Sequence, residues 1–195
     1  MSLVITGGQS GIDTWTLKWA LDNGYNCKVL FPLDKAGQII RQNLKDDTLD
    51  NFYTFFRDKI EIKTNPWSDK KYFNPHTDRD TKNVLETKQH NGKLVVFLLD
   101  IPETGRGSMR TAAKFVFNKN NPDLIEKRLP DGRDQGFLLI NNLLILIGIK
   151  HLDVYDKQKQ IFNEFIKDCK CLMFSGYCAS TYPNGYEWFS YITGT

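Results

Sequence analysis

The chain has 195 residues, of which 41% are hydrophobic and 25% charged, and its formal net charge is +3. A chain of this length buries roughly 70% of the surface of its unfolded form, so it needs no disulfide or metal to fold. We therefore expect a single domain over residues 1–195. The small charge gives no reason to expect a nucleic-acid partner.

The sequence also predicts a cytosolic protein without a membrane partner. Its start has no basic segment before the first apolar residues, as a secretory signal would have. The longest apolar stretch, residues 143–149, is far shorter than the ~20 residues that span a bilayer. The cysteines at positions 27, 169, 171 and 178 form no CxxC pair and have no histidine at zinc spacing. We expect reduced thiols and no metal site.

The first elements are typical of a strand–helix–strand unit. Residues 3–5 form a short β-branched run that ends in glycines, as a buried parallel strand does. Apolar residues recur at helical spacing from Ile12 to Asn23, and Gly24 ends the helix. Residues 27–32 are then expected to form the next strand.

The middle of the chain is less regular. Residues 35–74 are polar and aromatic, with a helix expected near 49–57 and a strand near 60–63, and we interpret them as an excursion over the sheet's carboxyl edge. A helix is expected over 77–89 and a strand over 93–100. A glycine-containing turn and a helix over 109–118 follow.

The remaining elements complete an α/β pattern. Residues 120–135 are a proline- and charge-rich connection, and 137–140 and 143–147 are apolar enough for one long or two short strands. A helix over 158–168 and a strand ending at Gly176 close the sequence. These repeated units predict a Rossmann-like open, mainly parallel sheet with helices on both faces.

The first glycine-rich turn follows the opening strand directly and consists of Gly7, Gly8, Gln9, Ser10 and Gly11. Glycines let a backbone turn sharply and approach a ligand closely. The amides and positive dipole end of the following helix favour a phosphate or carboxylate. Asp13 either stabilises that helix end or accepts a ligand hydroxyl or amine. The turn is neither a Walker loop nor GxGxxG.

A second glycine-rich turn follows the strand over 93–100. Gly105, Gly107, Ser108 and Thr111 lie there, and the two hydroxyls can donate to phosphate oxygens. Arg106 or Arg110 could form a bidentate pair with an anion, and Arg106 is the one we assign to the site. Turns at the carboxyl ends of parallel strands converge on one crevice, so we expect both turns to bind one ligand.

A polar helix contributes a third group. Arg79 and Asn83 are four residues apart and so share a helix face. This face is either an ordinary solvated surface or a rim that closes on the ligand.

These residues carry a resemblance to a known family. The segment from Gly7 to Asp13 resembles the Gly-Gly-Gln-Thr-Gly-Val-Asp motif of the molybdenum (cofactor) carrier family, which belongs to the SLOG superfamily and is related to the Rossmann-like LOG and DprA proteins. Later segments agree in order: Arg79-x-x-x-Asn83-Val84, Gly107-Ser108-x-x-Thr111, and Ser175-Gly176 with Ser180 and Pro183. Asp80 and Tyr177 depart from the family pattern, as do residues 35–75 and 119–136.

The resemblance implies a binding protein for a phosphorylated, nucleotide-like or molybdopterin-type ligand, with Gly176 in the site and a homodimer as the assembly. A nucleotide-processing hydrolase is the alternative. The related phosphoribohydrolases carry a glutamate where this chain has Thr111, which cannot act as a carboxylate acid or base; Asp13 or Asp100 would have to replace it. A protein-interaction module without a ligand is the third reading, and no catalytic residue is assigned.

Overall fold

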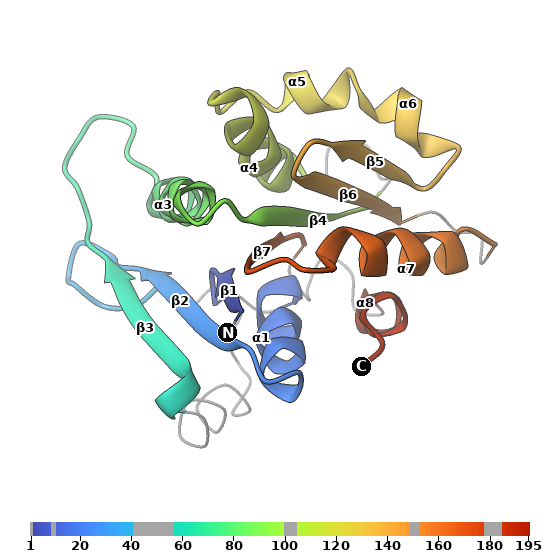
Figure 1. Ribbon diagram of the computed structural model, residues 1–195. Helices are drawn as coiled ribbons and strands as arrows, with labels where there is room; N and C mark the ends of the chain where they lie inside the picture. The colour runs from blue at the N-terminus through green and yellow to red at the C-terminus, as the bar shows by residue number, and fades with distance from the viewer. Residues whose placement is uncertain (1, 9–10, 41–56, 100–104, 149–152, 178–184) are drawn as a thin grey trace.

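One seven-stranded sheet organises the chain, in the order β3-β2-β1-β7-β4-β6-β5 (Figure 1). The computed structural model describes residues 2–8, 11–40, 57–99, 105–148, 153–177 and 185–195. Its strands are β1 (Leu3–Thr6), β2 (Asn26–Pro32), β3 (Ile60–Asn65), β4 (Lys93–Leu99), β5 (Phe137–Ile140), β6 (Leu143–Gly148) and β7 (Cys171–Ser175). Every neighbouring pair is parallel except β5 with β6.

The helices are α1 (Ile12–Asp22), η1 (Arg57–Lys59), α3 (Pro75–Gln89), α4 (Arg106–Phe117), α5 (Asp123–Glu126), α6 (Leu129–Arg133), α7 (Asp153–Ile166) and α8 (Gly185–Thr193). They cover both faces of the sheet. Side chains of α1, α7 and α8 form one buried cluster with alternate strand residues. Those of α3, α4, α5 and α6 form the other. The Rossmann-like α/β class expected from the sequence is confirmed.

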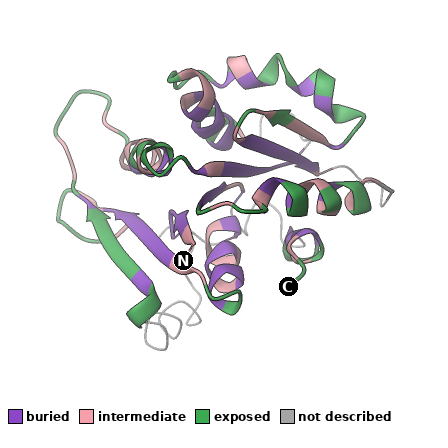
Figure 2. Cartoon of the chain, in the orientation of Figure 1, coloured by how far each residue is buried: buried purple, intermediate pink, exposed green. Residues whose placement is uncertain are grey.

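The strands are buried because a parallel sheet covered on both sides has no solvent face. β4 is typical: Leu94, Val96 and Leu98 pack into one cluster, while Val95, Phe97 and Leu99 pack into the other. Figure 2 shows this burial in the central strands and on the helix sides that face them, whereas β3 at one edge is largely exposed.

The strand order creates a switch point beside β7. From β1 the chain proceeds outward to β2 and β3. From β4 it proceeds the opposite way, to β5 at the far edge, and then returns to β6 beside β4. β7 lies between β1 and β4 and pairs with both. Ligands bind in the crevice outside the carboxyl ends of the strands at such a point.

Several elements differ from the expected ones. The strand near 60–63 is longer and joins the sheet as its edge, while the helix expected near 49–57 lies outside the described residues. α4 begins at Arg106 rather than 109, and α7 begins at Asp153 rather than 158. The connection 120–135 contains α5 and α6, and α8 was not expected.

Local side chains explain two of these element limits. Asn74 accepts hydrogen bonds from the amides of His76 and Thr77, and Pro75 occupies the first turn, so α3 begins before residue 77. Asn141 has a φ of 49° between the antiparallel strands β5 and β6, which therefore form a hairpin rather than one long strand. No helix formed by the described residues is long and apolar enough to cross a membrane.

Candidate functional site

The two glycine-rich turns meet at one cavity of about 340 Å³ at the switch point. Gly7 comes from the turn after β1, and Gly105, Gly107 and Ser108 come from the start of α4. The rest of the lining comes from Asp13 of α1, from Arg110 of α4, from residues 74–83 at the start of α3, and from residues 173–177 at the carboxyl end of β7. Gly7 of the first turn thus lies in the same cavity wall as the second turn, because only β7 separates β1 from β4.

The first turn is built around an arginine. The Arg79 Nη1 atom donates to the Gly7 carbonyl oxygen at 2.7 Å. A Cβ on Gly7 would lie 2.3 Å from that Nη1 atom and 2.6 Å from an Asp13 carboxylate oxygen. Gly7 is thus required by protein packing as well as by its place in the cavity wall.

The other members of the first turn take separate positions. Gly8, with a φ of 71°, packs against Val29 and Phe31 and does not line the cavity. Gly11 has a φ of 88° at the N-cap of α1, and the next amide, of Ile12, donates to the Tyr177 carbonyl at 3.2 Å. That amide is therefore not directed to a ligand. Gln9 and Ser10 lie outside the described residues.

Arg79 is a buried charge, only 3% exposed, so it does not belong to an ordinary solvated surface. Its Nε and Nη2 atoms contact Asp80 Oδ1 at 2.8 and 2.7 Å, and Nη1 lies 3.7 Å from Asp13 Oδ2. Desolvation lowers the pKa of Arg79, but the two carboxylates outweigh it and the net pKa is raised. The arginine therefore stays charged and holds Gly7, Asp13 and Asp80 together in the cavity wall.

Asn83 carries the observation most specific to a ligand. It lies one turn after Arg79 on α3, lines the cavity and is 2% exposed. Its Nδ2 atom is buried and has no hydrogen-bond partner in the described structure. The other such atom among the described side chains, Thr16 Oγ1, does not line the cavity. A buried donor without an acceptor costs about 1–3 kcal/mol, so an acceptor is expected from the cavity.

The start of α4 faces the same cavity. Gly105 adopts the left-handed conformation at the N-cap, with a φ of 79°, and no side chain of the described residues caps the helix. The first turn contains no acidic residue. Around Gly107 there is open space, since an added Cβ would meet no atom within 4 Å. A helix end of this kind attracts an anion.

The two hydroxyls of the second turn differ from the expectation. Ser108 Oγ donates to the Gly176 carbonyl at 3.1 Å, and Thr111 Oγ1 donates to the Gly107 carbonyl at 3.2 Å. Both donor hydrogens are therefore used within the protein in this structure. Gly176 lines the cavity as expected, and a Cβ there would lie 2.4 Å from Ile12, so it also permits close packing of β7 against α1.

The arginine assignment needs correction. Arg106 points away from the cavity, where its guanidinium contacts Asp123 of α5 at 3.3 Å and Glu126 at 3.8 Å. Arg110, one turn later, lines the cavity and forms no hydrogen bond or ion pair with a described residue. Two acidic residues after Asn121, in the connection to β5, attract Arg106, and the sequence pattern of α4 did not reveal this.

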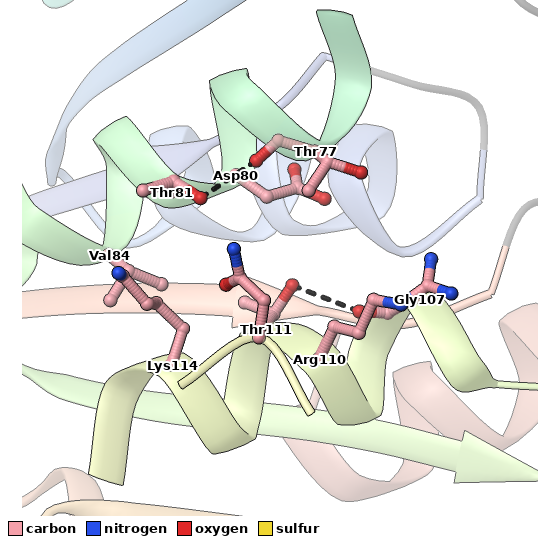
Figure 3. Close-up of a pocket in the computed structure, with 9 residues that line it drawn as sticks. Thr77, Asp80, Thr81, Val84, Gly107, Arg110, Thr111 and Lys114 are labelled. Carbon is pink, nitrogen blue, oxygen red and sulfur yellow. Dashed lines mark hydrogen bonds between the residues drawn. The ribbon is translucent and has the colours of Figure 1, made fainter. Parts of the chain in front are cut away.

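A narrow groove between α3 and α4 extends from the cavity (Figure 3). We call it the α3–α4 groove. It encloses about 20 Å³ and is lined by Thr77, Asp80, Thr81, Val84, Gly107, Arg110, Thr111, Lys114 and Asn120. Four of these residues also line the cavity: Thr77, Asp80, Gly107 and Arg110.

Burial shifts the pKa values of one histidine and two cysteines. Desolvation, together with the nearby charge of Arg79, lowers the pKa of His76 in the cavity wall, and Asp80 partly opposes this. His76 is therefore neutral at pH 7. Burial raises the pKa of the Cys27 and Cys171 thiols to about 12, so neither is a nucleophile at neutral pH.

Comparison with known proteins supports the fold. No protein-family model and no curated protein matches the sequence. A similar solved structure is the 1.45 Å crystal structure of "Putative molybdenum carrier protein" from Syntrophus aciditrophicus SB, with a TM-score of 0.54. The alignment covers 100% of this chain and 93% of that chain at 16% sequence identity. The two share a fold. At 16% identity the likeness shows the fold alone.

Proposed function

We propose that this protein binds a phosphorylated, nucleotide-like ligand in the cavity between the two glycine-rich turns. The observation that carries the proposal is the buried Nδ2 atom of Asn83, a residue of the cavity lining, which has no acceptor among the described residues. Asn83 and the uncapped N-terminus of α4 line the same cavity. The Asn83 amide and the free backbone amides at the start of α4 can therefore donate hydrogen bonds to one bound acceptor.

The cavity supports a phosphate at the α4 end. The backbone at Gly107 is open to approach, the helix dipole is positive there, and Arg110 has no ion pair among the described residues. A guanidinium in this position can bind a phosphate through two parallel hydrogen bonds. Arg106 is not part of this proposal.

The opposite side of the cavity suits a neutral, polar group. Asp13 and Asp80 offer carboxylate oxygens, which accept hydrogen bonds from ribose hydroxyls or ring amines. Arg79 cancels one of the two negative charges, so one net negative charge stays on this side, and we place the phosphate at the α4 end of the cavity instead. A cavity of about 340 Å³ lies in the range of small-molecule sites. The combination favours a nucleotide-like ligand over inorganic phosphate alone.

A molybdopterin-type ligand shares this chemistry, since it also joins a phosphate to a ring system with amine and carbonyl groups. Hydrolysis of an N-glycosidic bond receives less support. Thr111, which stands where the phosphoribohydrolases have glutamate, faces the α3–α4 groove and donates to the Gly107 carbonyl. It supplies no carboxylate for acid–base chemistry.

Calorimetric titration of the folded protein with nucleoside monophosphates, ADP-ribose and pterin phosphates tests the proposal. We expect saturable binding of at least one class, competed by the others in proportion to their phosphate content. Chromatography of the same mixtures for free base and ribose phosphate separates binding from turnover. Failure of every compound to bind at millimolar concentration would remove the proposed function.

A further inference from the structure

The charges of the cavity lining balance one another. Among the described lining residues, two carry a carboxylate, Asp13 and Asp80, and two carry a guanidinium, Arg79 and Arg110. The lining histidine, His76, is neutral at pH 7 because burial and the nearby charge of Arg79 lower its pKa. The described lining therefore has no net charge at neutral pH, and a ligand with two negative charges would leave the cavity strongly negative.

One of the carboxylates borders the place proposed for the phosphate. Asp80, Gly107 and Arg110 each line both the cavity and the α3–α4 groove, so they surround the start of α4. In Figure 3 Asp80 extends from α3 into the space that Gly107 and Arg110 border on α4. The Arg79 guanidinium is engaged within the wall, where its Nε and Nη2 atoms contact Asp80 at 2.8 and 2.7 Å. Among the described lining residues, the phosphate therefore has Arg110 as its cation and a carboxylate on the α3 side.

The hydroxyl groups at the start of α4 are already used. Ser108 Oγ donates to the Gly176 carbonyl at 3.1 Å, and Thr111 Oγ1 donates to the Gly107 carbonyl at 3.2 Å. A phosphomonoester presents three terminal oxygens, whereas a phosphodiester presents two, because its third oxygen is esterified. Neither hydroxyl hydrogen is available to a third terminal oxygen in this structure.

The start of α4 also leaves room for a group on that third oxygen. Gly107 lines the cavity, and a Cβ added to it would meet no atom within 4 Å. The place proposed for the phosphate is therefore open on this side. A second ester group can pass over Gly107 without displacing a described side chain.

We infer that the ligand presents its phosphate as a phosphodiester, with one negative charge, rather than as a terminal phosphomonoester, which carries about 1.5 to 2. Arg110 and the positive end of the α4 dipole, about half a unit charge, exceed the one net negative charge of the opposite wall by only about half a unit. A single charge on the ligand comes closest to balancing this sum. The inference rests on the proposed function and narrows its ligand class to phosphates that join two groups, as in a cyclic nucleotide or a dinucleotide.

Magnesium-free calorimetric titrations at pH 8 test the inference with two matched pairs, AMP with its methyl diester and ribose 5-phosphate with its methyl diester. The members of a pair differ by one negative charge, and the ribose pair makes the result independent of the base that the cavity prefers. We expect each diester to bind about tenfold more tightly than its monoester, because the second charge of the monoester has no positive partner in the described lining. Asp80→Asn removes one negative charge at the same size and should narrow the difference to less than about threefold.

Asp131→Asn serves as the matched control, because it makes the same change at an exposed residue of α6 that lines neither the cavity nor the groove. It should keep the preference for diesters. Monoesters that bind as tightly as their diesters in the unaltered protein would overturn the inference and leave the proposed function intact, and this comparison decides alone if Asp80→Asn does not fold. A preference that survives Asp80→Asn unchanged would also overturn it. If neither member of either pair nor any pterin phosphate binds, both proposals fall.

Discussion

At the scale of single residues, two asparagines are buried in the part of the chain that the structure describes, and their hydrogen bonding differs. Asn65 donates to Asp78 at 2.9 Å and accepts from Lys82, and its relative exposure is 0%. Asn83 is equally buried, but its Nδ2 atom has no partner. The first is a structural residue, and the second is held in an unfavourable state that a ligand would relieve.

Asn83→Leu should therefore stabilise the ligand-free protein by about 1–2 kcal/mol, since it removes an unsatisfied buried donor at similar volume. The same change should abolish ligand binding. Urea unfolding and calorimetry measure the two effects. Asn65→Leu is the control: it removes the buried hydrogen bonds that Asn65 forms with Asp78 and Lys82 and should destabilise the fold. A destabilised Asn83→Leu variant would mean that the amide serves packing instead.

Sequence reasoning assigned Asn83 and Arg79 to the site, with a solvated helix face and a rim that closes on the ligand as the two interpretations. Their four-residue spacing correctly predicted a shared helix face. It could not predict that this face turns inward against Gly7 and Asp13, because a polar helix face normally faces water. The charge of Arg79 was visible in the sequence, but its two carboxylate partners, one of them 66 positions away, were not.

At the scale of elements, the start of α4 is the part of the site most open to direct testing. Gly107 lies in the first turn, and its missing Cβ is not required by any protein contact within 4 Å. Glycine costs a helix up to about 1 kcal/mol relative to alanine. Close approach of a ligand, as proposed above, would account for a glycine that packing does not need.

Gly107→Ala should consequently leave the free energy of unfolding unchanged or raise it by up to about 1 kcal/mol. Because the new methyl group would stand in open space at a residue that lines the cavity, ligand affinity should fall at least about tenfold. Thermal unfolding and titration on the same preparation give both values. Unchanged affinity would place the ligand elsewhere. Gly7→Ala is not a useful substitute, since its Cβ would collide with Arg79.

Element limits were predicted where local signals are strong and missed where they depend on packing. Gly24 and the β-branched strands marked the first unit correctly. The short helices α5 and α6 were missed because four or five residues contain too little periodicity to show a helix. They are buried only through Ile125, Leu129 and Gly132, which pack under α4 and β5.

At the scale of the whole molecule, stability should depend on pH through His76 in the cavity wall. Desolvation and Arg79 lower its folded-state pKa below 6.5, so the unfolded chain binds more protons in that interval. Stability is therefore highest above pH 6.5 and is lost as the pH falls through the folded pKa. His76→Gln should remove this part of the pH dependence, as urea unfolding at several pH values will show.

The same histidine reports on the ligand. A phosphate bound nearby favours the protonated ring, so binding should raise the pKa of His76, measured by NMR titration of its ring protons. A His76 pKa that does not move when the ligand saturates the protein would contradict the placement of His76 beside the anion. So would an unfolding profile that is identical in the unaltered protein and the His76→Gln variant.

The homodimer and the cytosolic location that the sequence implied stay predictions.

The sequence by itself determined the α/β class, the mainly parallel sheet and the two glycine-rich turns. Strand burial, glycine conformation and helix spacing are local properties of the chain. Only the tertiary structure decided which side chains share the cavity. The order of strands brings β7 between β1 and β4, turns Arg79 inward and sends Arg106 outward to α5. Contacts between residues dozens of positions apart depend on packing in three dimensions, which no short sequence pattern encodes.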